Sequence, residues 1–353
     1  MNGRPGTRVE IAVVVCAHDE RRWETLLATL ASLRQQDHDP AETILVVDHN
    51  PSLLARCRRE LPDVTVVDNN ERRGLGGARN SGVAAASSDV VAFVDDDAVA
   101  SPQWLARLAD HYLDDAVAGA GGAIEPVWAR ERPPWFPPEF DWVVGCTYRG
   151  MPEDVREVRN LIGCNMSYRR ELLDELGRFQ LGYGCDETDL CIRLRQRWPA
   201  KRLLYVPEAR VFHQVEADRG RIQYFVKRCY FEGGSKAVVA KLVGAGDGLA
   251  SERSYVRSTL PRGIARRIHG FARRRDAAEL AQAGMIVVGL MSTVAGYATA
   301  QLRLRRAAER RGWNGSTQLG YEARSRGDDR DSARGRIRAR RGIRGWDPKQ
   351  NSS

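Results

Sequence analysis

The chain has 353 residues, a formal net charge of +9 and a hydrophobic content of 42%. This length predicts about two domains with ample core. Residues 310–353 carry twelve Lys or Arg against five Asp or Glu, a net +7 of the total +9. The remainder is therefore close to neutral, which argues against a nucleic-acid-binding protein with a basic stripe on its fold.

The seven cysteines are scattered, without the paired spacing of a metal site or a disulfide framework. Residues 1–8 are polar and do not resemble a secretory signal peptide, because the first apolar run follows them directly. We therefore expect a protein of the reducing cytoplasm.

Four short β-branched runs occur in the first hundred residues, and helical patterns separate most of them. The runs are Ile11–Val15, Thr43–Val47, Val64–Val67 and Val90–Val94. Apolar spacings of three and four predict a helix over Trp23–Leu33, and small residues predict one over Gly77–Ser87 that packs closely on a sheet. Alternating strands and helices predict an α/β fold with a parallel sheet and right-handed crossovers.

The fourth run ends abruptly in three carboxylates, Asp95, Asp96 and Asp97. Because such a triplet cannot continue into a buried core, it is expected at the carboxyl end of the strand, where open α/β sheets bind ligands. Asp95 and Asp97 point the same way and can share one Mg²⁺ or Mn²⁺. The alternative is an acidic turn that caps a helix beginning near Ser101-Pro102.

The glycines of Gly74–Gly77 raise the alternative of a dinucleotide-binding domain. That fingerprint should follow the first strand and open the first helix, whereas here Cys16–Asp19 follows the first strand and contains no glycine. A hydride-transfer enzyme is therefore disfavoured.

The stretch NERRGLGGARNSGVAAASSDVVAFVDDDA, Asn70–Ala98, resembles the core of family 2 glycosyltransferases of the GT-A fold. The matching motifs are Ala78–Gly82 and Asp95–Asp97, and the resemblance covers roughly residues 9–215. It implies a Rossmann-like, mostly parallel sheet flanked by helices, with a C-terminal helical region. It also implies a nucleotide-sugar donor and Mn²⁺ or Mg²⁺ as cofactor.

The resemblance assigns roles to individual residues. Asp48 would read the nucleotide base, Arg79 would lie near the base and diphosphate, and Asp95 would contact the ribose or donor sugar. Asp97 would be the principal metal ligand. The remaining assignments are donor binding for Ala17 and Asp96 and an additional metal ligand at His213, which could equally be a packed histidine.

The acidic cluster in Gly182–Trp198 resembles the segment that carries the family's catalytic base, at the start of a helix. Negative charge also suits the first turn of any helix, which is the simpler interpretation of the cluster. The family order Glu-Asp is reversed here as Asp186-Glu187. The alignment puts Glu187 in the base position, with Asp186 beside it.

A proline-rich loop contains five aromatic residues that either stack on a sugar or lipid-linked acceptor or pack on the core. They are Trp128, Trp135, Phe136, Phe140 and Trp142. A helix is predicted from Arg219 to about Lys241. Further on, Ala283–Ala300 carries no charge and has arginines on both sides, which favours an interfacial or re-entrant helix at an anionic membrane surface. The alternative is an ordinary buried helix.

These patterns divide the chain into a catalytic domain (1–218), a C-terminal helical region (219–309) and a basic disordered tail (310–353). The predicted function is inverting, metal-dependent transfer from a nucleotide sugar, with UDP expected, to a sugar, small-molecule or lipid-linked acceptor. The second half of the chain, from the aromatic loop that begins near Trp128 through Ala237, is similar to transferases that act on polyprenyl-phosphate-linked acceptors. We expect a cytoplasmic protein, peripheral at the inner face of the cell membrane.

Two alternatives stay open. One is a catalytically silent nucleotide-sugar-binding partner. The other is a nucleotidyltransferase, although that class usually carries a loop rich in glycine and basic residues after the first strand, which Cys16–Glu20 does not supply.

Overall fold

The computed structural model describes residues 9–180, 186–243 and 250–310. Residues 1–300 belong to one compact unit and residues 301–353 to a second. The predicted tail beyond residue 310 and the segment 182–185 before the acidic cluster lie outside the described residues. The predicted domain boundary at residue 218 stays a prediction.

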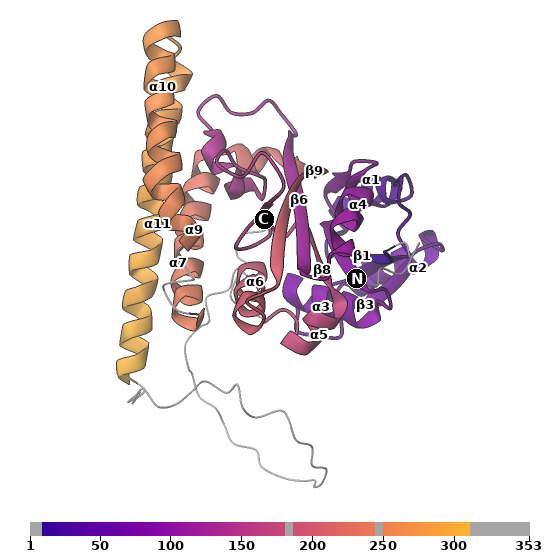
Figure 1. Ribbon diagram of the computed structural model, residues 1–353. Coiled ribbons are helices and arrows are strands. Elements are labelled where there is room, and N and C mark those ends of the chain that lie inside the picture. Colours follow the sequence, from indigo (N-terminus) through magenta and orange to yellow (C-terminus); the bar gives the residue numbers. More distant parts are fainter. Residues whose placement is uncertain (1–8, 181–185, 244–249, 311–353) are drawn as a thin grey trace. The chain divides into compact units, whose positions relative to one another are not determined.

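A nine-stranded sheet forms the centre of the described part of residues 1–300 (Figure 1). Its order is β3-β2-β1-β4-β8-β6-β9-β5, and β7 pairs with β9. The strands are β1 (Ile11–Ala17), β2 (Glu42–Val47), β3 (Thr65–Asp68), β4 (Val90–Asp95), β5 (Ala98–Ala100), β6 (Val117–Trp128), β7 (Arg156–Glu157), β8 (Asn165–Arg169) and β9 (Arg202–Val215).

The first four strands are parallel, as their alternation with helices predicted. Strand β8 then runs antiparallel to both β4 and β6, and β9 runs parallel to β6 but antiparallel to β5 and β7. The sheet is therefore mixed, with its parallel half built from the first hundred residues.

Helices cover both faces of this sheet. Helices α1 (Trp23–Leu33), α2 (Pro51–Glu60) and α4 (Trp104–Ala109) share one hydrophobic cluster, and α3 (Leu75–Ala85), α5 (Arg170–Leu176) and α6 (Asp186–Arg197) share the other. Because side chains alternate along a strand, Val13 faces the first cluster and Val14 the second. A Cβ on Gly82 of α3 would lie 2.4 Å from the Val14 side chain, so the close packing of this helix on the sheet requires glycine at that position.

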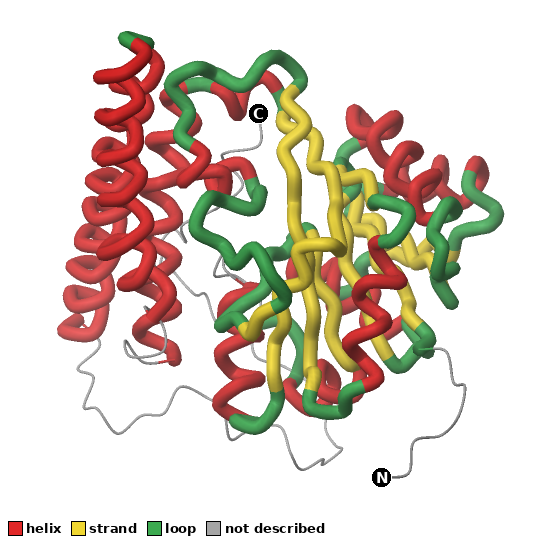
Figure 2. Tube along the Cα trace, turned by 45° about the horizontal axis from the view of Figure 1, so that its top comes forward, coloured by secondary structure: helices red, strands yellow, loops and turns green. Residues whose placement is uncertain are grey.

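The C-terminal helices follow β9. They are α7 (Ile222–Val243), α9 (Ala250–Ser254), α10 (Leu260–Arg274), which continues α9 through a π-helical turn over Tyr255–Thr259, and α11 (Ala277–Arg310). Helices α7 and α11 lie side by side (Figures 1 and 2). A Cβ on Gly296 of α11 would lie only 1.9 Å from the carbonyl oxygen of Tyr230 of α7. The helix predicted from Arg219 begins at Ile222.

Helix α11 is long and apolar enough over Ala277–Arg306 to cross a membrane, judged by length and composition alone. Within residues 1–300 it packs on the protein through Ile286 and Gly289, both buried. Met291 and Val294 remain 62% and 52% exposed. The apolar segment of α11 is therefore partly buried and partly exposed to solvent.

The aromatic loop joins the C-terminal helices to the core. Phe136 and Phe140 are buried, and each ring centroid lies 5.3 Å from that of Phe225 in α7. Phe140 and Trp142 also line a cavity, so the loop both packs on the core and faces open space.

Candidate functional site

Strand pairing brings the aspartate triplet against His213. Asp95 ends β4, and the chain then turns through Asp96 and Asp97 into β5. In the ladder between β5 and β9, Ala98 pairs with His213, and the Gln214 amide donates to the Asp97 carbonyl at 2.8 Å. His213 Nε2 lies 3.2 Å from Asp97 Oδ1. The carboxylates therefore stand at the strand end, as the sequence predicted.

Arginine side chains surround the two buried aspartates. Arg22 Nη1 lies 3.1 Å from both Asp96 Oδ1 and Asp97 Oδ2, and Arg219 lies 4.0 Å from Asp97 Oδ2. Burial acts to raise the pKa of Asp97, but His213, Arg22 and Arg219 outweigh it, so this pKa lies below its usual range. Burial dominates at Asp96 and raises its pKa to about 7.

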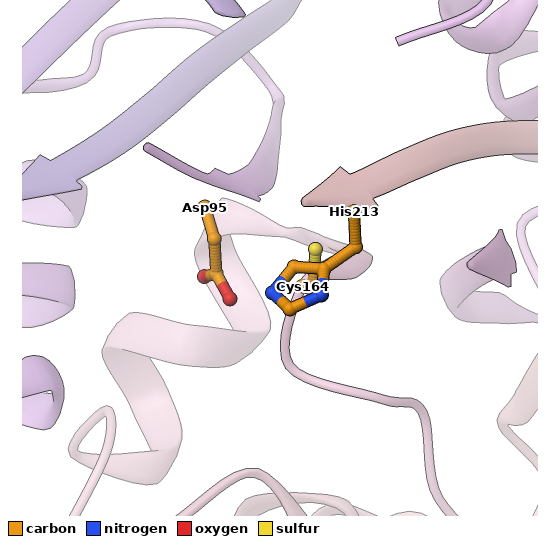
Figure 3. A group of neighbouring side chains, drawn as sticks. All are labelled: Asp95, Cys164 and His213. Carbon is orange, nitrogen blue, oxygen red and sulfur yellow. The ribbon is translucent and has the colours of Figure 1, made fainter. Parts of the chain in front are cut away.

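The donor atoms at this point fit a divalent cation. In the part of the chain that the structure describes, Asp96 Oδ2 is buried and accepts no hydrogen bond, and the buried Asp97 Oδ1 has the His213 ring as its neighbour. Asp95, Cys164 and His213 each place a ligand atom within 4.8 Å of the others (Figure 3). Carboxylate and imidazole groups suit Mn²⁺. Burial raises the pKa of the Cys164 thiol well above its usual range, so the thiol acts there as a neutral side chain.

A cavity of about 400 Å³ opens beside this centre, lined by residues of the sheet and its loops and of the C-terminal helices. Asp95, Arg79 and Glu187 all line it. Arg79 is almost fully buried, donates to the Gly163 carbonyl at 3.0 Å and lies 3.7 Å from Asp95. The described residues around the cavity do not include Asp96 or Asp186.

The acidic cluster begins helix α6, as expected from the resemblance, and its members differ in their surroundings. Glu187 faces the cavity. Burial raises the pKa of Glu187, while Arg79 acts in the opposite direction. Asp189 is buried and accepts a hydrogen bond of 2.7 Å from Arg193, which gives it a structural role.

Asp48 anchors the loops beside the donor edge of the sheet. It accepts hydrogen bonds from Asn69 Nδ2 at 2.6 Å and from the Gly74 amide at 2.9 Å. Its own amide donates to the Ala17 carbonyl at 2.8 Å, which brings the ends of β1 and β2 together. Gly74 has a φ of +124°, which favours glycine at that position.

Sequence reasoning missed Arg22 and Cys164. Many arginines occur in the chain, and nothing in their spacing singles out Arg22 as the partner of the triplet. Cys164 reaches the centre through the turn that precedes β8, and that turn has no pattern in sequence. A charge argument could have predicted that buried carboxylates need a cation, but not which one.

Comparisons with known proteins identify the family of the chain. The model of glycosyl transferase family 2 matches residues 12–177. Over 244 residues, 65% of this chain, the protein is 35% identical to a glucosyl-dolichyl phosphate glucuronosyltransferase of Haloferax volcanii, covering 77% of that protein. The chain belongs to glycosyl transferase family 2.

Other similarities to this glycosyltransferase are more distant. A pre-mycofactocin glycosyltransferase of Mycobacterium tuberculosis is 28% identical over half of this chain and 37% of its own length. The structure of the mannosyltransferase PcManGT from Pyrobaculum calidifontis covers 89% of this chain and 90% of its own, with 19% identity and a TM-score of 0.51. It shows a shared fold, and the predicted GT-A fold is confirmed.

Proposed function

We propose that this glycosyltransferase moves a sugar, with inversion, from a metal-bound UDP-sugar to an acceptor carried on a polyprenyl phosphate. The observation that carries the proposal is that Asp95, Arg79 and Glu187 line one cavity beside the buried Asp97–His213 pair. The relative from Haloferax volcanii, named for a dolichyl phosphate substrate, supports the acceptor class. The PcManGT structure holds GDP-Man and Mn²⁺, which supports a metal-bound donor.

The donor would lie at the carboxyl end of the strands. Asp97, His213 and Asp95 would hold Mn²⁺ or Mg²⁺, which neutralises charge on the departing diphosphate. Arg79 lies beside Asp95 and stabilises the same charge with its guanidinium group. Asp48, fixed by Asn69 and Gly74, would accept a hydrogen bond from the base.

Glu187 would act as the general base. An inverting transfer needs a carboxylate within reach of the acceptor hydroxyl, which loses its proton as it attacks the anomeric carbon. The burial that raises the pKa of Glu187 brings this pKa closer to neutral pH and makes the carboxylate a stronger proton acceptor. Asp186, its neighbour in the chain, is the alternative base.

The acceptor would reach the cavity from a membrane surface. Helix α11 exposes apolar side chains over about two turns at Val287, Met291 and Val294. Arginines at 273–275 precede this stretch and Arg303, Arg305 and Arg306 follow it in sequence. An apolar helix face with basic ends suits an orientation in the plane of an anionic bilayer.

Calorimetric titration of UDP, with and without Mn²⁺, tests the donor site on the wild type and Asp97→Ala. Metal-dependent binding that the variant loses is the expected result. Incubation with UDP-sugars and a polyprenyl-phosphate-linked sugar then tests turnover. Release of UDP supports transfer, and binding without turnover would indicate a silent partner. Release of pyrophosphate in a parallel incubation with UTP and a sugar 1-phosphate would indicate a nucleotidyltransferase.

Co-sedimentation with vesicles that contain anionic phospholipid tests the membrane surface. Met291→Glu should reduce the bound fraction, because it places a charge on the exposed apolar face of α11. Leu113→Glu, at a residue that is 74% exposed and lies before strand β6, is the matched control. Equal binding of both variants and the wild type would contradict the proposed surface.

A further inference from the structure

The cavity is also lined by a cluster of charged side chains to which the proposed chemistry gives no role. Helix α7 supplies Arg228, Glu232 and Lys236, one turn apart on one face of the helix. Arg159 comes from the loop before β8, and Glu252 comes from α9. Glu187 and Asp95 line the same cavity.

Two of these cations converge on one carboxylate. Arg159 Nη1 and Nη2 donate to the two oxygens of Glu252 at 2.8 and 2.9 Å, a bidentate fork. Lys236 Nζ lies 2.9 Å from Glu252 Oε1. The side chains of Arg159 and Lys236 are only 8% and 14% exposed, so their charges are largely removed from bulk water.

Among the described residues, this cluster holds three cations, Arg159, Arg228 and Lys236, and two carboxylates, Glu232 and Glu252. Burial acts to raise the pKa of Glu252, but Lys236 and Arg159 outweigh it and bring this pKa to about 2. Glu232 lies 3.4 Å from Lys236 and 3.3 Å from Arg228, so three cations share two carboxylates. A fork of arginine N–H groups with a lysine ammonium also fits the oxygens of a phosphate.

The rest of the wall is apolar and aromatic. Residues of this kind that line the cavity include Trp142, Tyr148, Tyr255, Leu260 and Leu290. A site that combines a buried cationic pair with such a wall suits a ligand in which an anionic group joins an apolar chain to a polar head. The polar head would then extend toward Glu187.

We infer that Arg159 and Lys236 bind the phosphate of the acceptor, and that the Glu252 carboxylate occupies these cations until the acceptor displaces it. This inference rests on the proposed function and names the residues that recognise its acceptor. The exchange leaves each buried cation paired with an anion throughout, which avoids the cost of an unpaired charge. A phosphate that joins a polyprenyl chain to a sugar is a diester with one negative charge, as Glu252 has, so the displacement also depends on contacts between the apolar chain and the cavity wall.

The two parts of this inference predict opposite effects of mutation. Lys236→Met and Arg159→Gln should each weaken phosphate binding by about tenfold or more, because each removes a charge-assisted contact. Glu252→Gln should strengthen it, because it removes the competing carboxylate. Lys227→Met, at an exposed position on the same helix, should leave it unchanged. If the cluster had only a structural role, Glu252→Gln would not strengthen phosphate binding.

The experiment is a calorimetric titration of farnesyl phosphate into the full chain in the absence of a nucleotide sugar. Farnesol has the apolar chain without the phosphate, and inorganic phosphate has the anion without the chain. Each should bind more weakly than farnesyl phosphate. Dioctanoyl phosphatidate should also bind more weakly. Equal binding of phosphatidate would overturn the acceptor assignment in favour of a lipid head group.

Titration of UDP with Mn²⁺ into the same samples separates this inference from the proposed function and shows that each variant is folded. The inference is overturned if UDP binds normally while Lys236→Met and Arg159→Gln bind farnesyl phosphate like the wild type. A weaker affinity in Glu252→Gln would also overturn it. If UDP fails to bind even the wild type but the three predicted affinity changes appear, the donor proposal fails and the phosphate site stands.

Discussion

His213 Nε2 lies 3.2 Å from Asp97 Oδ1, although 115 residues separate the two in sequence. The contact follows from the ladder between β5 and β9, in which His213 pairs with the residue after Asp97. Both side chains are buried, at 4% and 6% exposure. The sheet therefore fixes an imidazole and a carboxylate together at the strand end where a metal-bound diphosphate would lie.

Changing either member of this pair should impair the metal site. Asp97→Asn and His213→Gln should each reduce Mn²⁺-dependent UDP affinity by at least about 100-fold. Loss of a residue that only supports a metal ligand typically costs up to about 100-fold, and loss of a ligand itself should cost more. Calorimetry with and without Mn²⁺ measures the change. His269→Gln, at an exposed position on α10, controls for loss of a histidine. Unchanged metal dependence in both variants would rule out the pair as ligands.

Glu187 and Asp186 should differ in their effect on turnover. Glu187→Gln should lower transfer about 100- to 10,000-fold and leave UDP affinity intact, because it removes only the proton acceptor. Asp186→Asn is the matched control and should cost much less, since Glu187 is the one that lines the cavity. The reverse order of the two effects would assign the base to Asp186.

The pH profile of transfer should also report Glu187. Burial raises the pKa of this carboxyl, with Glu232 and Asp186 adding to the shift and Arg79 opposing it. Because the base works only when ionised, the rate should rise with pH through a pKa above the ordinary glutamate value. A rate that is already constant at the ordinary value would contradict this assignment.

Asp96 should make stability depend on pH. Its pKa is about 7 in the folded protein against an ordinary 3.8, so the folded state holds a proton that the unfolded state loses between these values. The free energy of unfolding of the wild type should therefore fall relative to Asp96→Asn as pH rises from about 4 to 7, by no more than about 4 kcal/mol. Denaturant titrations at several pH values measure this difference. Asp110→Asn, on the surface, controls for the lost charge, and parallel curves for Asp96→Asn would contradict the prediction.

The parallel half of the fold was predictable because its strands alternate with amphipathic helices and are apolar on both faces. The predicted runs at Ile11–Val15 and Val90–Val94 lie within β1 and β4. Strand β6 was not predicted, since it is rich in glycine and alanine. The structure explains this composition: a Cβ on Gly121 would lie 2.5 Å from the Asn165 carbonyl oxygen. Close approach of a partner strand leaves no pattern of its own in sequence.

The candidate site was predictable only where a motif carried it. The strand end that holds Asp95 and Asp97 follows from an apolar run ending in carboxylates. Arg159 and Lys236 did not follow from any pattern, because they are 77 residues apart and meet at Glu252 only in the folded chain. Contacts of this kind depend on tertiary packing, and single residues do not signal them.

Two glycines of α11 should respond in opposite ways to the same substitution. A Cβ at Gly296 would lie 1.9 Å from the Tyr230 carbonyl oxygen of α7, whereas a Cβ at Gly284 would meet nothing within 4 Å. Gly296→Ala should therefore lower the free energy of unfolding by about 1–3 kcal/mol, because the two helices must separate. Gly284→Ala should raise it by about 1 kcal/mol, since alanine favours the helix over glycine. Thermal or denaturant unfolding of the two variants measures both changes, and a loss of stability in both, or in neither, would contradict the close contact between α7 and α11.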